Sequence, residues 1–157
     1  MGNRYDVTPI FADANCFTQL VEDLSEPFQN SQVEFVACVD ALGFILGTAI
    51  ALRLNAGIIP IRKGGKLPVE ADSVEFRDYS GEVKRLEIRR DILPPQACIL
   101  LVDEWIETGA QVQAAAQLIE RRGGIIVGIA SINMDENATT AAIAEKYTVH
   151  TVWETEP

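Results

Sequence analysis

Short runs of consecutive aliphatic residues alternate along the chain with segments in which apolar side chains recur every three or four positions. The runs are typical of buried strands, and the longer spacing is typical of amphipathic helices. Strands are predicted at 34–39, 57–61, 98–102, 125–132 and 148–152. Helices are predicted at 16–29, 43–55, 109–122 and 138–147. Segments 74–79 and 82–88 flank Ser80 and Gly81, which predicts a β-hairpin.

This order of elements predicts an α/β fold with a mostly parallel twisted sheet, helices on both faces and a flanking β-hairpin. The 157 residues suit one domain spanning 1–157, because a chain of this length can bury a single core. In parallel sheets, ligands bind beyond the carboxyl ends of the strands. Segments 40–43, 62–66 and 103–111 each follow a predicted strand, so we expect them to meet at one edge of the sheet.

Composition narrows the possible functions. Apolar residues make up 48% of the chain, and the formal net charge is -10, which argues against general nucleic-acid binding. The basic cluster 62–66 still allows an anionic small ligand. No apolar run reaches the ~18 residues of a membrane span, and no signal peptide is recognisable, so we expect a cytoplasmic protein without membrane contact. The three cysteines are expected to be small buried thiols.

The segment ILLVDEWIETGAQ, residues 99–111, carries the strongest chemical signal. Asp103 and Glu104 stand where an aliphatic strand ends, and carboxylates there can accept hydrogen bonds from sugar hydroxyls. A small Thr108-Gly109 turn then starts a helix, and backbone N–H groups at a helix start bind phosphate. Together these features indicate a ribose 5-phosphate site. An ordinary strand-to-helix loop with an acidic first turn accounts for the same residues.

The segment also resembles the phosphoribosyl diphosphate (PRPP) binding motif of type I phosphoribosyltransferases, most closely the adenine branch of that family. The likeness extends over nearly the whole chain. Four further segments match in order: RYDVTPIFAD, VDALGFILGTAIALRL, IPIRKGGKLP and LEIRRDILPP.

The resemblance implies the type I phosphoribosyltransferase fold and a role for each matching residue. The acid pair, Asp103 and Glu104, would be catalytic and bind the ribose hydroxyls, directly or through Mg²⁺. The residues that would hold the 5-phosphate are Glu107, Thr108, Gly109, Ala110 and Gln111. Those on the pyrophosphate side would be Ala41, Leu42, Gly43, Arg62, Lys63 and Lys66.

The implied reaction transfers ribose 5-phosphate from PRPP to a purine-like base, adenine above all, and releases pyrophosphate. Mg²⁺ is the implied cofactor, PRPP and a nucleobase are the implied ligands, and a homodimer is the implied assembly. Four departures from the family pattern keep a second hypothesis open, namely a non-catalytic PRPP- or nucleotide-binding regulatory relative. Leu42 and Tyr5 each replace an Arg, Ser80 replaces the acid of the mobile loop, and Ala110-Gln111 replaces Gly-Thr.

Overall fold

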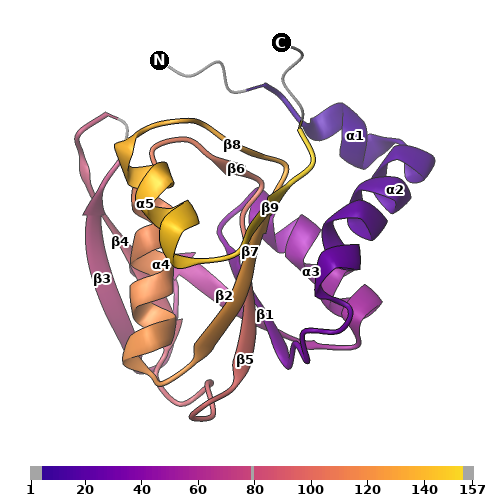
Figure 1. Ribbon diagram of the computed structural model, residues 1–157. Helices are drawn as coiled ribbons and strands as arrows, with labels where there is room; N and C mark the ends of the chain where they lie inside the picture. The colour runs from indigo at the N-terminus through magenta and orange to yellow at the C-terminus, as the bar shows by residue number, and fades with distance from the viewer. Residues whose placement is uncertain (1–4, 79, 154–157) are drawn as a thin grey trace.

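The computed structural model describes residues 5–78 and 80–153 and confirms the predicted α/β architecture (Figure 1). The main strands are β1 (Phe35–Val39), β2 (Gly57–Lys63), β3 (Ala71–Arg77), β4 (Val83–Arg89), β5 (Cys98–Val102), β7 (Ile125–Ser131) and β9 (Val149–Thr151). They form one sheet in the order β3-β4-β2-β1-β5-β7-β9. The five strands from β2 to β9 are parallel, whereas β4 and β3 extend the sheet as an antiparallel hairpin.

Helices cover both faces of this sheet. They are α1 (Thr8–Ala12), α2 (Ala14–Ser25), the 3₁₀ helix η1 (Glu26–Phe28), α3 (Leu42–Leu54), α4 (Ala110–Arg121) and α5 (Ala138–Lys146). Figure 1 shows α2 and α3 on one side of the sheet and α4 and α5 on the other. Each side has its own hydrophobic core, one around Leu46 and Ile50 of α3 and one around Leu118 and Ile119 of α4.

The first helical segment differs from the prediction of one helix over 16–29. Helix α2 begins earlier because the Asp13 side chain caps it, accepting hydrogen bonds from the backbone N–H of Asn15 and Cys16 at 3.0 and 2.8 Å. It ends at Ser25, and η1 follows with Pro27 in its first turn. Helix α1 was not predicted, since its five residues contribute no buried side chain to reveal a period.

Strand β2 runs two residues further than predicted. Arg62 and Lys63 were assigned to a loop, but they pair with Glu87 and Leu86 of β4. Pro60 lies in the part of β2 that pairs with β1 and precedes the β4 pairing, so one side of β2 is unpaired at the residue that lacks an N–H. The extension of β2 turns the side chain of Lys63 toward the end of the sheet where the predicted site lies.

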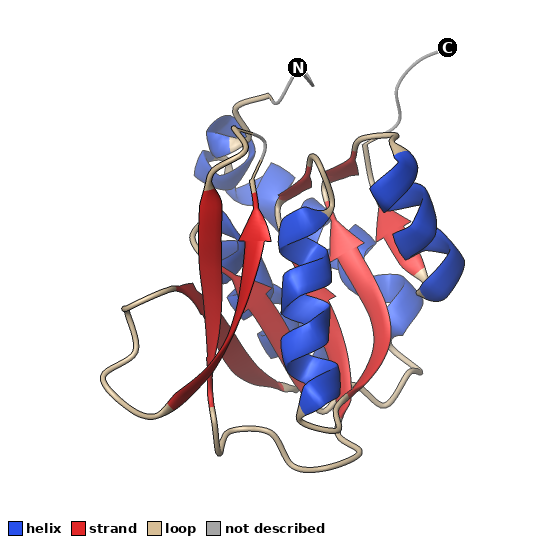
Figure 2. Ribbon diagram, turned by 90° about the vertical axis from the view of Figure 1, so that its left-hand side faces the viewer, coloured by secondary structure: helices blue, strands red, loops and turns tan. Residues whose placement is uncertain are grey.

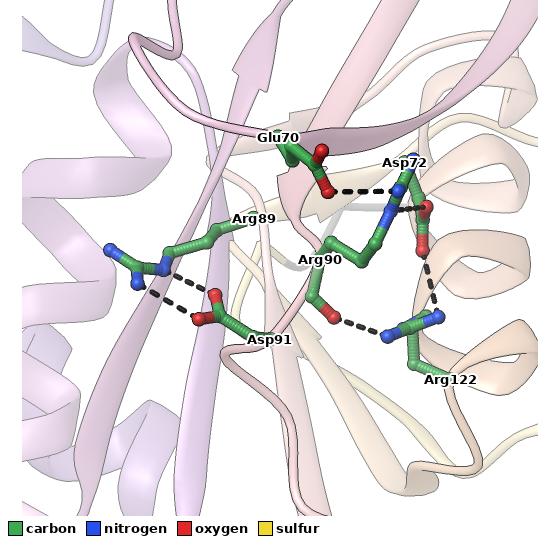
Figure 3. Close-up of polar contacts among 6 residues, drawn as sticks. All are labelled: Glu70, Asp72, Arg89, Arg90, Asp91 and Arg122. Carbon is green, nitrogen blue, oxygen red and sulfur yellow. Dashed lines mark hydrogen bonds and ion pairs between the residues drawn. The ribbon is translucent and has the colours of Figure 1, made fainter.

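Ion pairs fix the base of the hairpin to the rest of the molecule (Figure 3). Asp72 lies between Arg90 and Arg122, with N–O distances of 3.1 and 3.2 Å, and Glu70 binds Arg90 at 3.0 Å. Arg89 and Asp91 form a separate pair beside this network, in which Nη2 of Arg89 donates to Oδ2 of Asp91 at 2.9 Å. Figure 2 shows the opposite end of the hairpin, its connecting turn, at the same end of the molecule as the start of α4.

The cysteines depart from the expectation of three buried thiols. Cys38 on β1 is buried, but Cys16 is exposed and Cys98 is half-buried. All three are free thiols. Among the described residues, no helix is long and apolar enough to cross a membrane.

Candidate active site

The acid pair lies where β5 ends, and it is buried. Asp103 is 2% exposed and Glu104 is 6% exposed. Oδ1 of Asp103 accepts the backbone N–H of Glu104 at 2.9 Å, and Oδ2 accepts the side-chain amide of Gln111 at 2.9 Å. Burial, and next the charge of Glu104, raise the pKa of Asp103 well above its ordinary value. The structure therefore holds a carboxyl group where its charge is costly, which is common at functional sites.

The turn after the acid pair has the backbone geometry of an anion site. Gly109 has a φ of +80° and caps α4. A Cβ there would lie 2.9 Å from Cδ1 of Ile143, so the position requires glycine in both conformation and space. Gly109 supplies no side-chain cap to α4, and the nearby Thr108 hydroxyl accepts the N–H of Ala110 at 3.3 Å. The remaining first-turn N–H groups of α4 are suited to an anionic ligand.

A pocket of about 290 Å³ opens beside this turn. One wall is the segment from Asp103 to the first turn of α4, the opposite wall is the hairpin, and Lys63 lies between them. The lining residues are Lys63, Phe76, Asp78, Lys84, Asp103, Trp105, Ile106, Glu107, Thr108, Gly109, Gln111 and Val112. Its volume is at the small end of the range for small-molecule sites, and its lining mixes apolar side chains with charges of both signs.

Six of the thirteen predicted site residues line this pocket: Lys63, Asp103, Glu107, Thr108, Gly109 and Gln111. Glu104 and Ala110 adjoin it in the chain without lining it. Arg62 and Lys66 lie apart from it, and Nη1 of Arg62 donates a hydrogen bond to the carbonyl of Lys66 at 3.0 Å. Of the predicted cations, Lys63 is therefore the one in position to meet a ligand in the pocket.

The segment 41–43 lies on the other side of Asp103. Gly43 is buried, and a Cβ on it would be 3.5 Å from Oδ1 of Asp103. Leu42 packs against the core between α2 and α3, whereas Ala41 is exposed. Helix α3 begins here without a side-chain cap from Ala41. The N-termini of α3 and α4 thus flank the same carboxylate, so the two ends of a doubly anionic ligand could each meet a helix start.

A small parallel sheet beside the acid pair was not predicted. It pairs β6 (Trp105–Ile106) with β8 (Asn133–Met134). The indole N–H of Trp105 donates to Oδ1 of Asp135 at 3.1 Å, and the same oxygen accepts the amide of Asn133 at 2.7 Å. The Asn137 amide donates to the carbonyl of Glu107 at 2.9 Å, which fastens α5 to the turn before α4.

Trp153, near the C-terminal end of the described residues, has its ring held between two other aromatic side chains. Its ring stacks on Tyr5 with centroids 5.2 Å apart and meets Trp105 edge-on at 5.7 Å. Residues 154–157 lie outside the described residues.

The hairpin contributes Phe76, Asp78 and Lys84 to the pocket, and sequence reasoning missed all three. The two-residue period of a strand contains the signal. Lys84 shares its strand face with the buried Leu86 and Ile88, and it pairs across the hairpin with Phe76. A lysine that continues a row of core residues is expected to point inward at the end of that row.

Comparison with known proteins identifies the family, although no protein-family model matches the chain. The adenine phosphoribosyltransferase of Rhodopirellula baltica is 37% identical over 150 residues, covering 95% of this chain and 72% of that protein. The enzyme of the same name from Halothermothrix orenii is 40% identical over 124 residues, covering 79% and 72%. The chain belongs to the adenine phosphoribosyltransferase family.

Solved structures of adenine phosphoribosyltransferases have the same fold. The structure from Thermoanaerobacter pseudethanolicus has a TM-score of 0.87 at 30% identity, covering 94% of this chain and 86% of the other. A Saccharomyces cerevisiae structure, complexed with an imino-altritol bisphosphate and adenine, has a TM-score of 0.83 at 26% identity. Coverage is 93% and 84% there. The predicted family and type I phosphoribosyltransferase fold are thereby confirmed.

Proposed function

We propose that this protein transfers the 5-phosphoribosyl group of PRPP to adenine, forming AMP and pyrophosphate. One observation carries the proposal: the buried Asp103 and the glycine-capped start of α4 line one pocket in a chain of the adenine phosphoribosyltransferase family. This arrangement matches a ligand with hydroxyls close to a phosphate. Such an activity recovers a free purine base as a nucleotide, which is purine salvage.

The proposed roles follow from position. The Thr108–Gln111 turn binds the 5-phosphate through the N–H groups at the start of α4, with Glu107 fixing the turn through its carbonyl. Asp103 and Glu104 accept hydrogen bonds from the ribose hydroxyls. In the reaction, a base nitrogen attacks the anomeric carbon as pyrophosphate leaves, and positive charge develops on the ribose. The nearby carboxylates stabilise that charge.

The leaving group is expected on the side of segment 41–43 and Lys63. Two features favour an anion there: the uncapped start of α3 beside Asp103 and the ammonium group of Lys63. Arg62 and Lys66 do not line the pocket and contribute positive charge only from the neighbouring part of the chain. Preorganised donors and cations aimed at a leaving diphosphate lower the barrier to its departure.

We also propose Mg²⁺ as the cofactor. Within 5–78 and 80–153, no cluster of three or more His, Cys, Asp or Glu offers a protein-only cage. Mg²⁺ commonly binds through one or two carboxylates together with substrate phosphates, and Asp103 and Glu104 suit that mode. When bound with PRPP, the ion would neutralise charge on the diphosphate.

The test is an assay of pyrophosphate release from PRPP and Mg²⁺ with adenine, guanine, hypoxanthine, xanthine, uracil and orotate. Release is expected with adenine. The double variant Asp103→Asn, Glu104→Gln is expected to abolish it while remaining folded. Normal turnover by that variant would remove the acid pair from the mechanism, and activity with another base alone would overturn the choice of adenine.

A second candidate is a non-catalytic PRPP or nucleotide sensor. Leu42 favours it, because this half-buried residue packs against the core and offers no charge to a leaving diphosphate. A sensor binds PRPP without turning it over, so PRPP raises the melting temperature while pyrophosphate release stays at background. Turnover with any base would reject this candidate.

The proposed assembly is a cytoplasmic homodimer. Its support is an apolar row along α3, in which Ile45 is 47% exposed and Leu52 is 79% exposed with Ala49 between them. Exposed apolar rows of this kind mark contact surfaces. Light scattering is expected to give twice the chain mass, and Leu52→Asp is expected to halve it.

The proposed cytoplasmic location is supported by the three free thiols, which suit a reducing compartment.

A further inference from the structure

Binding of PRPP requires more positive charge in the pocket than the cations predicted from the sequence supply. PRPP carries a phosphate at one end and a diphosphate at the other. The start of α4 provides for the phosphate, but among the predicted cations Lys63 alone lines the pocket. Of the described lining residues, a second one is a cation, Lys84 on the hairpin.

The sheet register brings these two lysines together. Lys63 of β2 pairs with Leu86 of β4, and Lys84 lies two residues further along β4 toward the pocket. Residues that pair directly point to the same face of a sheet, as do residues two apart in one strand. Lys63 and Lys84 are therefore diagonal neighbours on one face, at a typical Cα separation of about 7–8 Å. Two ammonium groups at that spacing can reach the same diphosphate.

The present contacts of Lys84 leave it able to change partner. Its Nζ pairs with the exposed carboxylate of Glu82 and lies 3.7 Å from Oδ2 of Asp78. Asp78 already accepts the N–H of Ser80 at 2.9 Å and that of Glu82 at 3.1 Å, so the turn keeps its hydrogen bonds when Lys84 moves. Exposed ion pairs of this kind contribute little stability, whereas a diphosphate offers several charges to one lysine.

We propose that Lys84, together with Lys63, binds the diphosphate group of PRPP and stabilises it as it leaves the ribose as pyrophosphate. The inference rests on the proposed function, since it assumes that PRPP occupies this pocket. In binding the ligand, Lys84 exchanges the carboxylate of Glu82 for the diphosphate. The hairpin thereby supplies a cation to the leaving-group side of the site.

The experiment compares Lys84→Met with Lys84→Arg and with Arg85→Met by calorimetric titration at fixed Mg²⁺. Arg85 is the control because it lies next to Lys84 on the same strand, points to the opposite face, where it pairs with Glu87 at 3.0 Å, and does not line the pocket. The ligands are PRPP, pyrophosphate and ribose 5-phosphate. Ribose 5-phosphate lacks the diphosphate, so it separates the two ends of the site.

Lys84→Met is expected to weaken PRPP and pyrophosphate binding about tenfold or more, the usual effect of losing a charge-assisted hydrogen bond. The affinity of Lys84→Met for ribose 5-phosphate should equal that of the unmodified protein. Lys84→Arg should restore most of the PRPP affinity, and Arg85→Met should bind all three ligands normally. In the adenine assay, the KM for PRPP should rise for Lys84→Met while the KM for adenine stays constant.

Three results would overturn the inference: unchanged PRPP binding by Lys84→Met, equal weakening of all three ligands, or an equal loss in Arg85→Met. These outcomes can be distinguished from failure of the proposed function. If the proposed function is wrong, the unmodified protein itself binds neither PRPP nor ribose 5-phosphate, and the inference about Lys84 is then wrong as well. Melting curves of each variant confirm that the compared proteins are folded.

Discussion

The side-chain amide of Gln111 donates a hydrogen bond to Oδ2 of Asp103 over 2.9 Å. This bond joins the first turn of α4 to the end of β5, so the proposed phosphate and ribose subsites are linked before any ligand binds. It stabilises the ionised carboxylate, but burial and the charge of Glu104 outweigh it and raise the pKa of Asp103. A buried carboxylate whose ionised form is disfavoured in this way is expected to lower the free energy of unfolding.

Asp103→Asn is therefore expected to raise the melting temperature while abolishing activity. The sign follows from linkage: the pKa of Asp103 is higher in the folded state than the ordinary value of 3.8. The folded protein thus binds the proton more tightly, and the free energy of unfolding falls as pH rises above that value. The asparagine variant should be the more stable protein at pH 7, by roughly 2–4 °C for each kcal/mol relieved.

Thermal scans of both proteins between pH 4 and pH 8 measure this effect. The gap between the two melting temperatures should widen with pH and nearly close at pH 4. A variant that melts below the unmodified protein at pH 7 would contradict the assignment of Asp103 as a destabilised group.

Gly109→Ala should destabilise the protein and weaken PRPP binding. The φ of +80° alone costs a non-glycine residue about 1–2 kcal/mol, and the new methyl group would press on Ile143 and Thr139. Gly123→Ala is the matched control, because Gly123 also has a φ of +80° but its nearest neighbour is 3.8 Å from an added Cβ. Urea unfolding should show a larger loss for Gly109→Ala, and only that variant should lose affinity for ribose 5-phosphate.

Asn137 has two separable functions. Its side-chain oxygen caps α5 by accepting the N–H of Thr139 and Thr140, and its amide nitrogen donates to the carbonyl of Glu107. Asn137→Ala removes both and should lower the free energy of unfolding by about 1 kcal/mol. Asn137→Asp keeps the cap and loses the donor.

The aspartate variant should therefore recover much of the stability, yet both variants should show a raised KM for PRPP because the turn before α4 is no longer fastened to α5. Urea unfolding and steady-state kinetics on the three proteins separate the two effects. Normal KM values in both variants would mean that the bond to Glu107 does not shape the phosphate site.

The thiols should differ sharply in reactivity. Burial, with a smaller effect from Asp103, raises the pKa of Cys38 to about 12, so almost no thiolate forms at neutral pH. Cys16 is exposed. A chromogenic disulfide reagent at pH 7.5 should modify Cys16 before the others and should reach Cys38 only in denaturant, as peptide mapping can verify. Rapid labelling of Cys38 in the folded protein would contradict its burial on β1.

The elements that make the core were predictable from the sequence. The strand 98–102 contains four consecutive aliphatic residues, 99–102, which are all buried, and the helix starting near Gly109 shows both its period and its turn. Helix α1 escaped prediction because none of its five residues is buried. The β6–β8 pair escaped prediction because its few residues are fixed by contacts distant in sequence. Trp105, for example, is held by Asp135, thirty positions away.

Within the site, contiguous motifs were predictable from the sequence. Which side chains from different strands meet at the pocket was not predictable. The Asp103–Gln111 segment is contiguous, so its chemistry could be read directly. Whether Arg62, Lys63 or Lys66 reaches the pocket depends on where β2 stops pairing with β4, and this register is a tertiary property. Lys84 was missed for a different reason, because the strand period that places it on the face of Leu86 and Ile88 lies outside the motif segments.

The contact between Trp105 and Trp153 also makes the protein its own optical probe. These are the two tryptophans of the chain, their rings are 5.7 Å apart, and Trp105 comes directly after Glu104. Ultraviolet-excited emission from the native protein therefore originates from one spot next to the acid pair, against a background of three tyrosines. Ligand binding, and the formation of the Trp105–Trp153 contact during refolding, can both be followed by this emission without attaching a dye.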